Sequence, residues 1–242
     1  MRLESPEQDR SGHRPAVAAD RLLVFARRPV AGRVKTRLTP PLAPDDAAQL
    51  YEACLHDVVA TAARERARIE IWYDGGAEAE AYFAREFPLL ARAPQAPGSL
   101  GERLEDALAR SFADGAERVA VVGSDAPTLP LSSIAAAFDD LHEVDAVLGP
   151  AADGGYYLVG VRAAGWPRAA ALFRSIPWST DEVLRASGER AAEAGLEIRL
   201  LPGWYDLDRA EDLVRAREDA DPESHLGRWL AGPDGARYLA GG

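Results

Sequence analysis

The sequence has 242 residues, 47% of them hydrophobic and 7% aromatic, and a formal net charge of −11 at pH 7. This length suits one large α/β domain, and no apolar run approaches the ~18 residues of a membrane-spanning helix. The negative charge argues against a nucleic acid or an anionic membrane as partner, because both attract basic surfaces.

The N-terminal segment comes first along the chain. Residues 1–19 mix charged residues, Ser and Pro with no apolar stretch, which predicts a disordered leader rather than a signal peptide. The only cysteine, Cys54, can form neither an internal disulfide nor a thiolate metal site, so we expect it to be buried and structural. These features together favour a cytoplasmic protein.

Strand and helix patterns then alternate. Short apolar runs predict strands at residues 22–26, 69–73, 119–122, 146–148, 156–161 and 198–201. Helical spacing predicts helices at residues 45–66, 99–113, 131–141, 179–194 and 209–220, the fourth opening with a Ser179–Glu182 capping box. Alternation of this kind predicts a mostly parallel α/β sheet, with a local antiparallel pair at residues 156–161. We expect the domain to span residues 20–221 and residues 222–242 to form a peripheral tail, with one short helix around residues 225–230.

A basic loop follows the first predicted strand. Five of the 28 basic residues lie within eleven positions, namely Arg27, Arg28, Arg33, Lys35 and Arg37. Lys35 is the only lysine in the chain, and its compact ammonium suits phosphate. Because ligands bind at the carboxyl ends of strands in open α/β sheets, we predict that Arg27, Arg33, Lys35, Thr36 and Arg37 bind a nucleotide phosphate. The alternative is a solvated basic loop. The Gly spacing does not fit a Walker A loop.

The segment Gly123-Ser124-Asp125 follows a buried strand. Gly123 and Ser124 join the predicted phosphate-binding set, and Asp125 is the predicted ligand of Mg²⁺ or Mn²⁺ beside a diphosphate. The alternative is that Asp125 only organises the turn or caps the next helix.

Two later motifs complete the candidate site. Asp153, Gly154, Gly155 and Tyr156 form a turn where backbone can approach a sugar or an acceptor closely, although a plain hairpin explains the same spacing. Further on, Asp206 and Asp208 are the candidates for a second acidic metal ligand, and we expect only one of the two to face Asp125. The alternative role for Asp208 is to cap the helix that follows.

Four motifs follow one another along the chain: the basic loop, Gly-Ser-Asp-x-Pro, Gly-Pro-x-x-Asp-Gly-Gly-Tyr-Tyr and Asp-x-Asp-x-x-x-Asp-Leu. In this order they resemble the DUF2064 family over residues 21–220. Members of this family are also described as glycosyltransferase A-like or radical-SAM/selenodomain-associated transferases. The resemblance implies a GT-A, nucleotide-diphospho-sugar transferase fold, a three-layer α/β/α arrangement. It also implies a distant relation to molybdopterin and phospholactate guanylyltransferases.

The resemblance also assigns roles by position. Asp125 matches the first metal ligand of the wider fold, and Asp208 is the better candidate for the second, with Asp206 behind it. Arg33, Lys35 and Arg37 match the loop that covers the donor phosphates. Asp153, Gly154 and Gly155 match the entry of the sugar or acceptor. The chain departs from sugar nucleotidyltransferases in lacking their Gly-x-Gly-Thr-Arg-Met loop, and from many glycosyltransferases in having Ser-Asp-Ala where Asp-x-Asp is usual.

Three functions remain open. The first is a metal-dependent glycosyltransferase that takes a nucleotide sugar and a small-molecule acceptor, with Lys35 adding positive charge and Asp153 positioning the acceptor or acting as base. The second is a nucleotidyltransferase that joins an NTP to a phosphorylated acceptor. The third is a nucleotide-binding protein without catalysis.

Overall fold

The computed structural model describes residues 19–239. The predicted leader, residues 1–19, therefore lies outside the described residues apart from Ala19. No helix in the described part of the chain is both long enough and apolar enough to cross a membrane.

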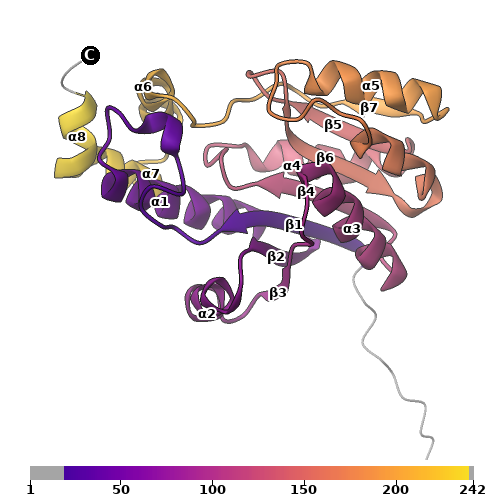
Figure 1. Cartoon of the computed structure of the whole chain (residues 1–242), viewed down its shortest axis with the longest axis horizontal. Helices are drawn as coiled ribbons and strands as arrows, with labels where there is room; N and C mark the ends of the chain where they lie inside the picture. The colour runs from indigo at the N-terminus through magenta and orange to yellow at the C-terminus, as the bar shows by residue number, and fades with distance from the viewer. Residues whose placement is uncertain (1–18, 240–242) are drawn as a thin grey trace, which may run out of the picture.

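A seven-stranded sheet forms the middle of the molecule (Figure 1). Its strands are β1 (Asp20–Arg27), β2 (Arg68–Asp74), β3 (Ala91–Pro94), β4 (Arg118–Gly123), β5 (Ala146–Pro150), β6 (Tyr156–Arg162) and β7 (Ile198–Leu200). Their spatial order is β3-β2-β1-β4-β6-β5-β7. Only β6 runs antiparallel to its neighbours β4 and β5. The predicted mixed, mostly parallel sheet is thus confirmed, including the antiparallel pairing of residues 156–161.

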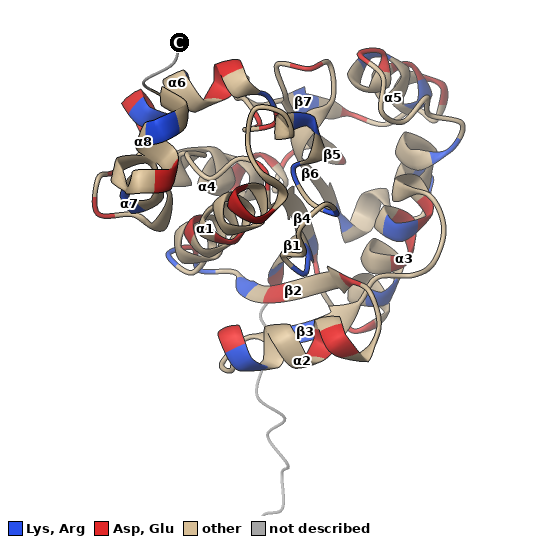
Figure 2. Ribbon diagram, turned by 60° about the vertical axis from the view of Figure 1, so that its left-hand side comes forward, with Lys and Arg blue, Asp and Glu red and all other residues tan. Residues whose placement is uncertain are grey.

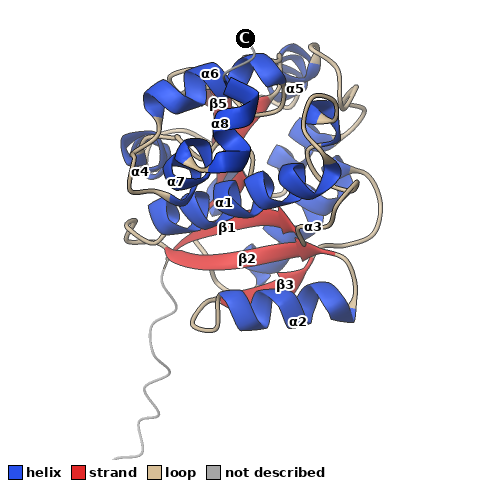
Figure 3. Cartoon of the chain, turned by 90° about the vertical axis from the view of Figure 1, so that its left-hand side faces the viewer, coloured by secondary structure: helices blue, strands red, loops and turns tan. Residues whose placement is uncertain are grey.

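Helices cover both faces of this sheet (Figure 3). They are α1 (Pro44–Ala62), α2 (Ala77–Glu86), α3 (Leu100–Ala113), α4 (Leu131–Asp140), α5 (Val183–Glu193), α6 (Ala210–Asp219), α7 (His225–Ala231) and α8 (Pro233–Leu239). Three short 3₁₀ helices add to them: η1 (Thr36–Leu38), η2 (Ala163–Gly165) and η3 (Arg168–Phe173). Acidic and basic segments are interspersed along outer helices such as α2 (Figure 2).

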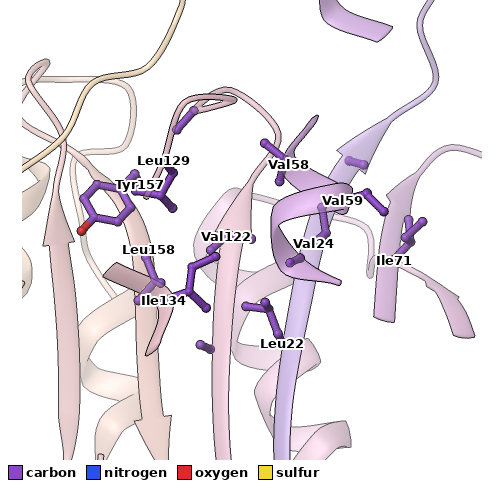
Figure 4. Close-up of a cluster of buried hydrophobic side chains, with 14 of the residues drawn as sticks. Leu22, Val24, Val58, Val59, Ile71, Val122, Leu129, Ile134, Tyr157 and Leu158 are labelled. Carbon is purple, nitrogen blue, oxygen red and sulfur yellow. The ribbon is translucent and has the colours of Figure 1, made fainter. Parts of the chain in front are cut away.

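The sheet has a separate hydrophobic core on each face. Successive side chains of a strand point to opposite faces, so alternate residues belong to different cores. Leu22 and Val24 pack with side chains of α1, α2 and α4 on one face (Figure 4). Leu23, between them, packs with side chains of α3, α5 and η3 on the other. This confirms the three-layer α/β/α fold.

The beginning of α5 differs from the sequence prediction. A capping box at Ser179 and Glu182 was expected, but the helix starts at Val183 with Glu182 at the N-cap. Ser179 instead has a positive φ of 66°, and Thr180 donates its hydroxyl to the carbonyl of Pro177. The polar residues before α5 therefore form a turn of their own.

The C-terminal helices differ from the peripheral tail that the sequence suggested. α7 lies against α1 (Figure 1). Leu226 and Leu230 are buried in a third apolar cluster with Cys54 and with Leu38 of the basic loop. Leu226 and Leu230 are four residues apart and so share one face of α7, which α1 covers. Cys54 is fully buried, consistent with a structural role.

Candidate functional site

A cavity of about 720 Å³ lies at the edge of the sheet where β1 and β4 end and the antiparallel β6 begins. Its volume falls within the roughly 300–1,000 Å³ typical of small-molecule sites. The loop after β1, the turn after β4 and the segment before α6 all reach this edge. The structure therefore brings together the basic loop, Asp125, Tyr156 and Asp208, as the order of the motifs predicted.

Lys35 lies at the bottom of this site. Its Nζ donates to Asp125 Oδ1 at 2.5 Å, to the carbonyl of Leu207 at 2.6 Å and to Asp208 Oδ1 at 3.2 Å. The lysine side chain is 1% exposed. An ammonium has three N–H donors, so all three are directed at protein oxygens. This differs from the predicted direct contact between Lys35 and a phosphate.

The electrostatics keep this lysine charged. Burial by itself lowers the pKa of Lys35, but the nearby charges of Asp125 and Asp208 outweigh burial and hold that pKa above its ordinary value. The backbone of Lys35 is left-handed, with φ 47°, and the flanking Val34 and Leu38 are buried. The loop thus fixes the lysine through both its backbone and its neighbours.

Both Asp206 and Asp208 line the cavity, which corrects the expectation that only one would face Asp125. Residues two apart in an extended segment point to the same side, and the N–H of Leu207 between them donates to the carbonyl of Asp125. Burial, followed by the charges of Asp125 and Asp208, raises the pKa of Asp206 to about 7.

Asp208 does not cap helix α6. Its carboxylate faces Lys35 and also Arg37, whose Nη1 lies 3.6 Å from Asp208 Oδ2. The N–H groups of Asp208 and Arg209 both donate to Asp212 Oδ2. Asp212 therefore has the capping role that was the alternative for Asp208.

Helix α1 contacts the turn after β4 through a hydrogen bond. The hydroxyls of Tyr51 and Ser124 are hydrogen-bonded at 2.8 Å, and Tyr51 also accepts from the N–H of Arg27. Burial, and then the charge of Asp125, raises the pKa of Tyr51 to about 12. Gly123 and Ser124 line the cavity. Their role in phosphate binding stays a prediction, and the Ser124 hydroxyl already has a partner in Tyr51.

Three arginines that line the cavity are also exposed to solvent, so they lie at its mouth. Arg27, Arg33 and Arg37 line it and are exposed, as is Thr36 beside them. Arg27 Nε lies 3.4 Å from Asp74, whereas Arg33 forms no ion pair with any described residue. The exposed positive charge that lines the cavity therefore comes from these arginines rather than from Lys35.

The turn containing Asp153 lies outside the residues that line the cavity, except for Tyr156. Asp153 is exposed, and its Oδ1 accepts from the N–H of Gly155 at 2.9 Å, as in a self-contained turn. Gly154 has φ 88°, and a Cβ there would lie 2.2 Å from the carbonyl oxygen of Asp181. The glycine is therefore needed for packing against the turn before α5, and this geometry places neither Gly154 nor Gly155 against a ligand.

One side of the cavity was absent from the sequence predictions. It is formed by Gln95 directly after β3, by Ser99, Leu100 and Arg103 at the beginning of α3, and by Trp178. Ser99 and Glu102 form a capping box, a pattern visible in the sequence. This segment follows β3 directly, and the end of β3 lies beside the cavity. Because β3 was not predicted, the sequence did not indicate that the segment lines the site.

A divalent cation at Asp125 and Asp208 is what the resemblance implies. Mg²⁺ binds carboxylate oxygens at about 2.0–2.1 Å, so a cation shared by the two Oδ1 atoms would take the space of the Lys35 ammonium. Within residues 19–239, no group of three or more His, Cys, Asp or Glu side chains is arranged to hold a metal ion. The residues as arranged do not fit a metal that bridges Asp125 and Asp208.

Comparisons with known proteins agree with the fold. The model of the DUF2064 family, "Uncharacterized protein conserved in bacteria", matches residues 57–180. A crystal structure of a "putative nucleotide-diphospho-sugar transferase" from Desulfovibrio desulfuricans G20 is 32% identical, with a TM-score of 0.86. The match covers 93% of this chain and 98% of that one. No curated protein matches the chain.

Two more distant structures share the fold alone. The inositol-1-phosphate CTP transferase from T. maritima is 14% identical, with a TM-score of 0.53 over 89% of this chain and 98% of its own. A 4-diphosphocytidyl-2C-methyl-D-erythritol synthase is 16% identical, with a TM-score of 0.54 over 84% of this chain and 99% of its own.

Proposed function

The chain belongs to the DUF2064 family of proteins conserved in bacteria, and we propose that it is a transferase whose donor is a nucleotide-diphospho-sugar. The similar protein from Desulfovibrio desulfuricans G20, described in those terms, supports this choice of donor. The acceptor is a small molecule that enters the same cavity.

The observation that carries the proposal is that three exposed arginines line the cavity. Arg33 and Arg37 extend from the loop after β1, and Arg27 ends that strand. Guanidinium groups bind phosphate oxygens in a bidentate manner, and a diphosphate leaving group needs its developing charge compensated. A cavity of this size, lined by arginines at the carboxyl ends of parallel strands, suits a nucleotide diphosphate.

Lys35 has an indirect role in this proposal. Since its donors are used by Asp125, Leu207 and Asp208, it orients the carboxylates instead of touching the donor. Asp153, the base expected from the sequence, has no part in this proposal, because its turn does not line the cavity that the acceptor enters.

Nucleotidyl transfer is the second candidate. The number of arginines at the mouth favours it, because a triphosphate carries more negative charge than the diphosphate of a sugar donor. The two reactions differ in the ligand that the resting protein binds. An NTP is the donor in nucleotidyl transfer, and a nucleotide sugar is the donor in glycosyl transfer.

A thermal-shift panel tests the proposal. The full chain is heated with UDP-, GDP- and CDP-sugars and with the NTPs, each with EDTA or with Mg²⁺. A ligand present at 100 times its dissociation constant stabilises the fold by about 2.7 kcal/mol. Stabilisation by a nucleotide sugar supports the first candidate, and stabilisation by NTPs alone supports the second. Failure of every nucleotide to stabilise the protein contradicts both.

A pair of arginine variants locates the binding. Arg33→Ala removes an exposed cation at the mouth and should weaken nucleotide binding. Arg92→Ala removes an exposed cation of β3 that does not line the cavity, so binding should be unchanged. Equal effects of both variants would show that only the net charge matters. Binding with no transfer to any acceptor would favour the non-catalytic alternative.

A further inference from the structure

We propose that the Lys35 ammonium takes the place of the divalent cation in this site, so that the site operates without a bound metal. This inference rests on the proposed function, since it concerns which cation neutralises the carboxylates of a nucleotide-phosphate site. Its geometric basis lies entirely in contacts between described residues.

The Lys35 ammonium lies between the two carboxylates that were expected to hold the metal. Lys35 Nζ lies 2.5 Å from Asp125 Oδ1 and 3.2 Å from Asp208 Oδ1. A cation that bridged these carboxylates would have to share this space with the ammonium, and two like charges at such short range repel strongly. The carboxylates predicted as metal ligands therefore already have a cation between them.

Three hydrogen bonds and burial hold the Lys35 ammonium in this position. Its third donor is used by the carbonyl of Leu207 at 2.6 Å, and only 1% of the side chain is exposed. Moving it away would break all three hydrogen bonds and leave a buried carbonyl and two carboxylates without their partner, which is costly. A metal would have to overcome this cost before it could bind.

The outer side of the Asp208 carboxylate faces a second basic group of the protein. Its second oxygen, Oδ2, lies 3.6 Å from Arg37 Nη1. Both oxygens of this carboxylate therefore face a basic group of the protein. A metal on the outer side would compete with Arg37, just as one on the inner side would compete with Lys35.

Binding of Mn²⁺ to the full chain, followed by electron paramagnetic resonance with no nucleotide present, tests the proposal. Wild type should show no Mn²⁺ site that depends on Asp125. Lys35→Met frees the two carboxylates, so Mn²⁺ affinity should rise by roughly tenfold or more, a change of about 1.4 kcal/mol or more. Adding Asp125→Asn to that variant should remove the new site.

The matched control is Arg33→Met. It removes an equal charge from the same loop, but from an exposed residue outside the carboxylate cluster, and it should gain no Mn²⁺ site. A gain equal to that of Lys35→Met would overturn the proposal, because charge alone would then explain both. A folded Lys35→Met protein that gains no site would overturn it too.

Wild type provides the test if Lys35→Met does not fold. A wild-type Mn²⁺ site that Asp125→Asn abolishes would refute the proposal, and equal Mn²⁺ binding by wild type and Asp125→Asn would support it.

Because this Mn²⁺ titration contains no nucleotide, its result can be interpreted even if the proposed function fails. Where a nucleotide does bind, its thermal shift should be the same in EDTA and in Mg²⁺. A shift that required Mg²⁺ and was lost in Asp125→Asn would likewise overturn the proposal.

Discussion

Tyr51 of helix α1 and Ser124 of the turn after β4 share a hydrogen bond of 2.8 Å between their hydroxyl oxygens. Both residues are buried, and Tyr51 also accepts from the backbone N–H of Arg27 at 2.8 Å. One phenol therefore joins the helix to the ends of two neighbouring strands that carry the site.

Tyr51→Phe should destabilise the fold by about 1–3 kcal/mol, because the buried Ser124 hydroxyl and the part-buried N–H of Arg27 both lose the Tyr51 hydroxyl as partner. Urea unfolding measures the loss. A double-mutant cycle with Ser124→Ala isolates the pair, and the two losses should be less than additive. Full additivity would show that the two hydroxyls act independently.

Leu226→Ala should destabilise the protein by about 2–5 kcal/mol, because this fully buried side chain packs α7 against α1. Leu89 is 95% exposed, and Leu89→Ala should change stability by no more than about 0.5 kcal/mol. Denaturant unfolding compares the two variants. If Leu226→Ala were as mild as Leu89→Ala, the C-terminal helices would contribute nothing to the stability of the fold.

Asp145 should make the stability of the protein depend on pH. Burial raises the pKa of this carboxyl, but hydrogen bonds from Arg162 and the Glu197 N–H, with the charges of Arg162 and Arg168, hold it below its ordinary value. A carboxylate whose pKa is lowered by folding stabilises the protein above its unfolded pKa and loses that effect as the pH falls through the folded pKa.

Asp145→Asn should therefore be less stable than wild type at neutral pH, and the difference should shrink below about pH 4. Thermal unfolding across that range measures it. Asp106→Asn is the control, because the pair of Asp106 with Arg110 is exposed and contributes little. A deficit in Asp145→Asn that stays constant with pH would contradict the assignment.

Gly101→Ala should be destabilising and should disturb the cavity. A Cβ at this position would lie 2.4 Å from the carbonyl oxygen of Phe173 and 2.8 Å from Trp178 Nε1, so α3 could not approach Trp178 as it does. Gly188, in helix α5, has open space around it, and a Cβ there would meet nothing within 4 Å. Gly188→Ala should therefore stabilise the protein by about 0.4–1 kcal/mol. Opposite signs in thermal unfolding are the expected result, and the same sign would contradict the close approach.

The meeting of Lys35, Asp125 and Asp208 could be anticipated from the sequence, since each follows a predicted strand or precedes a helix at one edge of the sheet. That the Lys35 ammonium would bind these two carboxylates could not be anticipated from the sequence. Whether an ammonium faces a ligand or a neighbouring carboxylate depends on distances that motif order does not contain. The left-handed backbone at Lys35, which a non-glycine residue adopts rarely, had no sequence signal either.

Two elements were missed for different reasons. Strand β3 has only four residues, Ala91–Pro94, and its side chains are small or charged, so it lacks an apolar run. Helix α2 did have a signal, because Ala79, Tyr82 and Phe83 follow helical spacing and are all buried. The omission of β3 also hid the side of the cavity around Arg103 and Trp178.

The contact between Lys35 and Asp208 joins residues 173 positions apart, and this has a consequence for biosynthesis. A ribosome delivers the lysine early and its second carboxylate only when most of the chain has been made. Until residues 206–208 emerge, the ammonium has at most Asp125 as its acidic partner. The loop after β1 then lacks its contacts with Leu207 and Asp208. The site is therefore among the last parts of the protein to form, and a prematurely terminated chain carries its cations without the carboxylates that hold them in place.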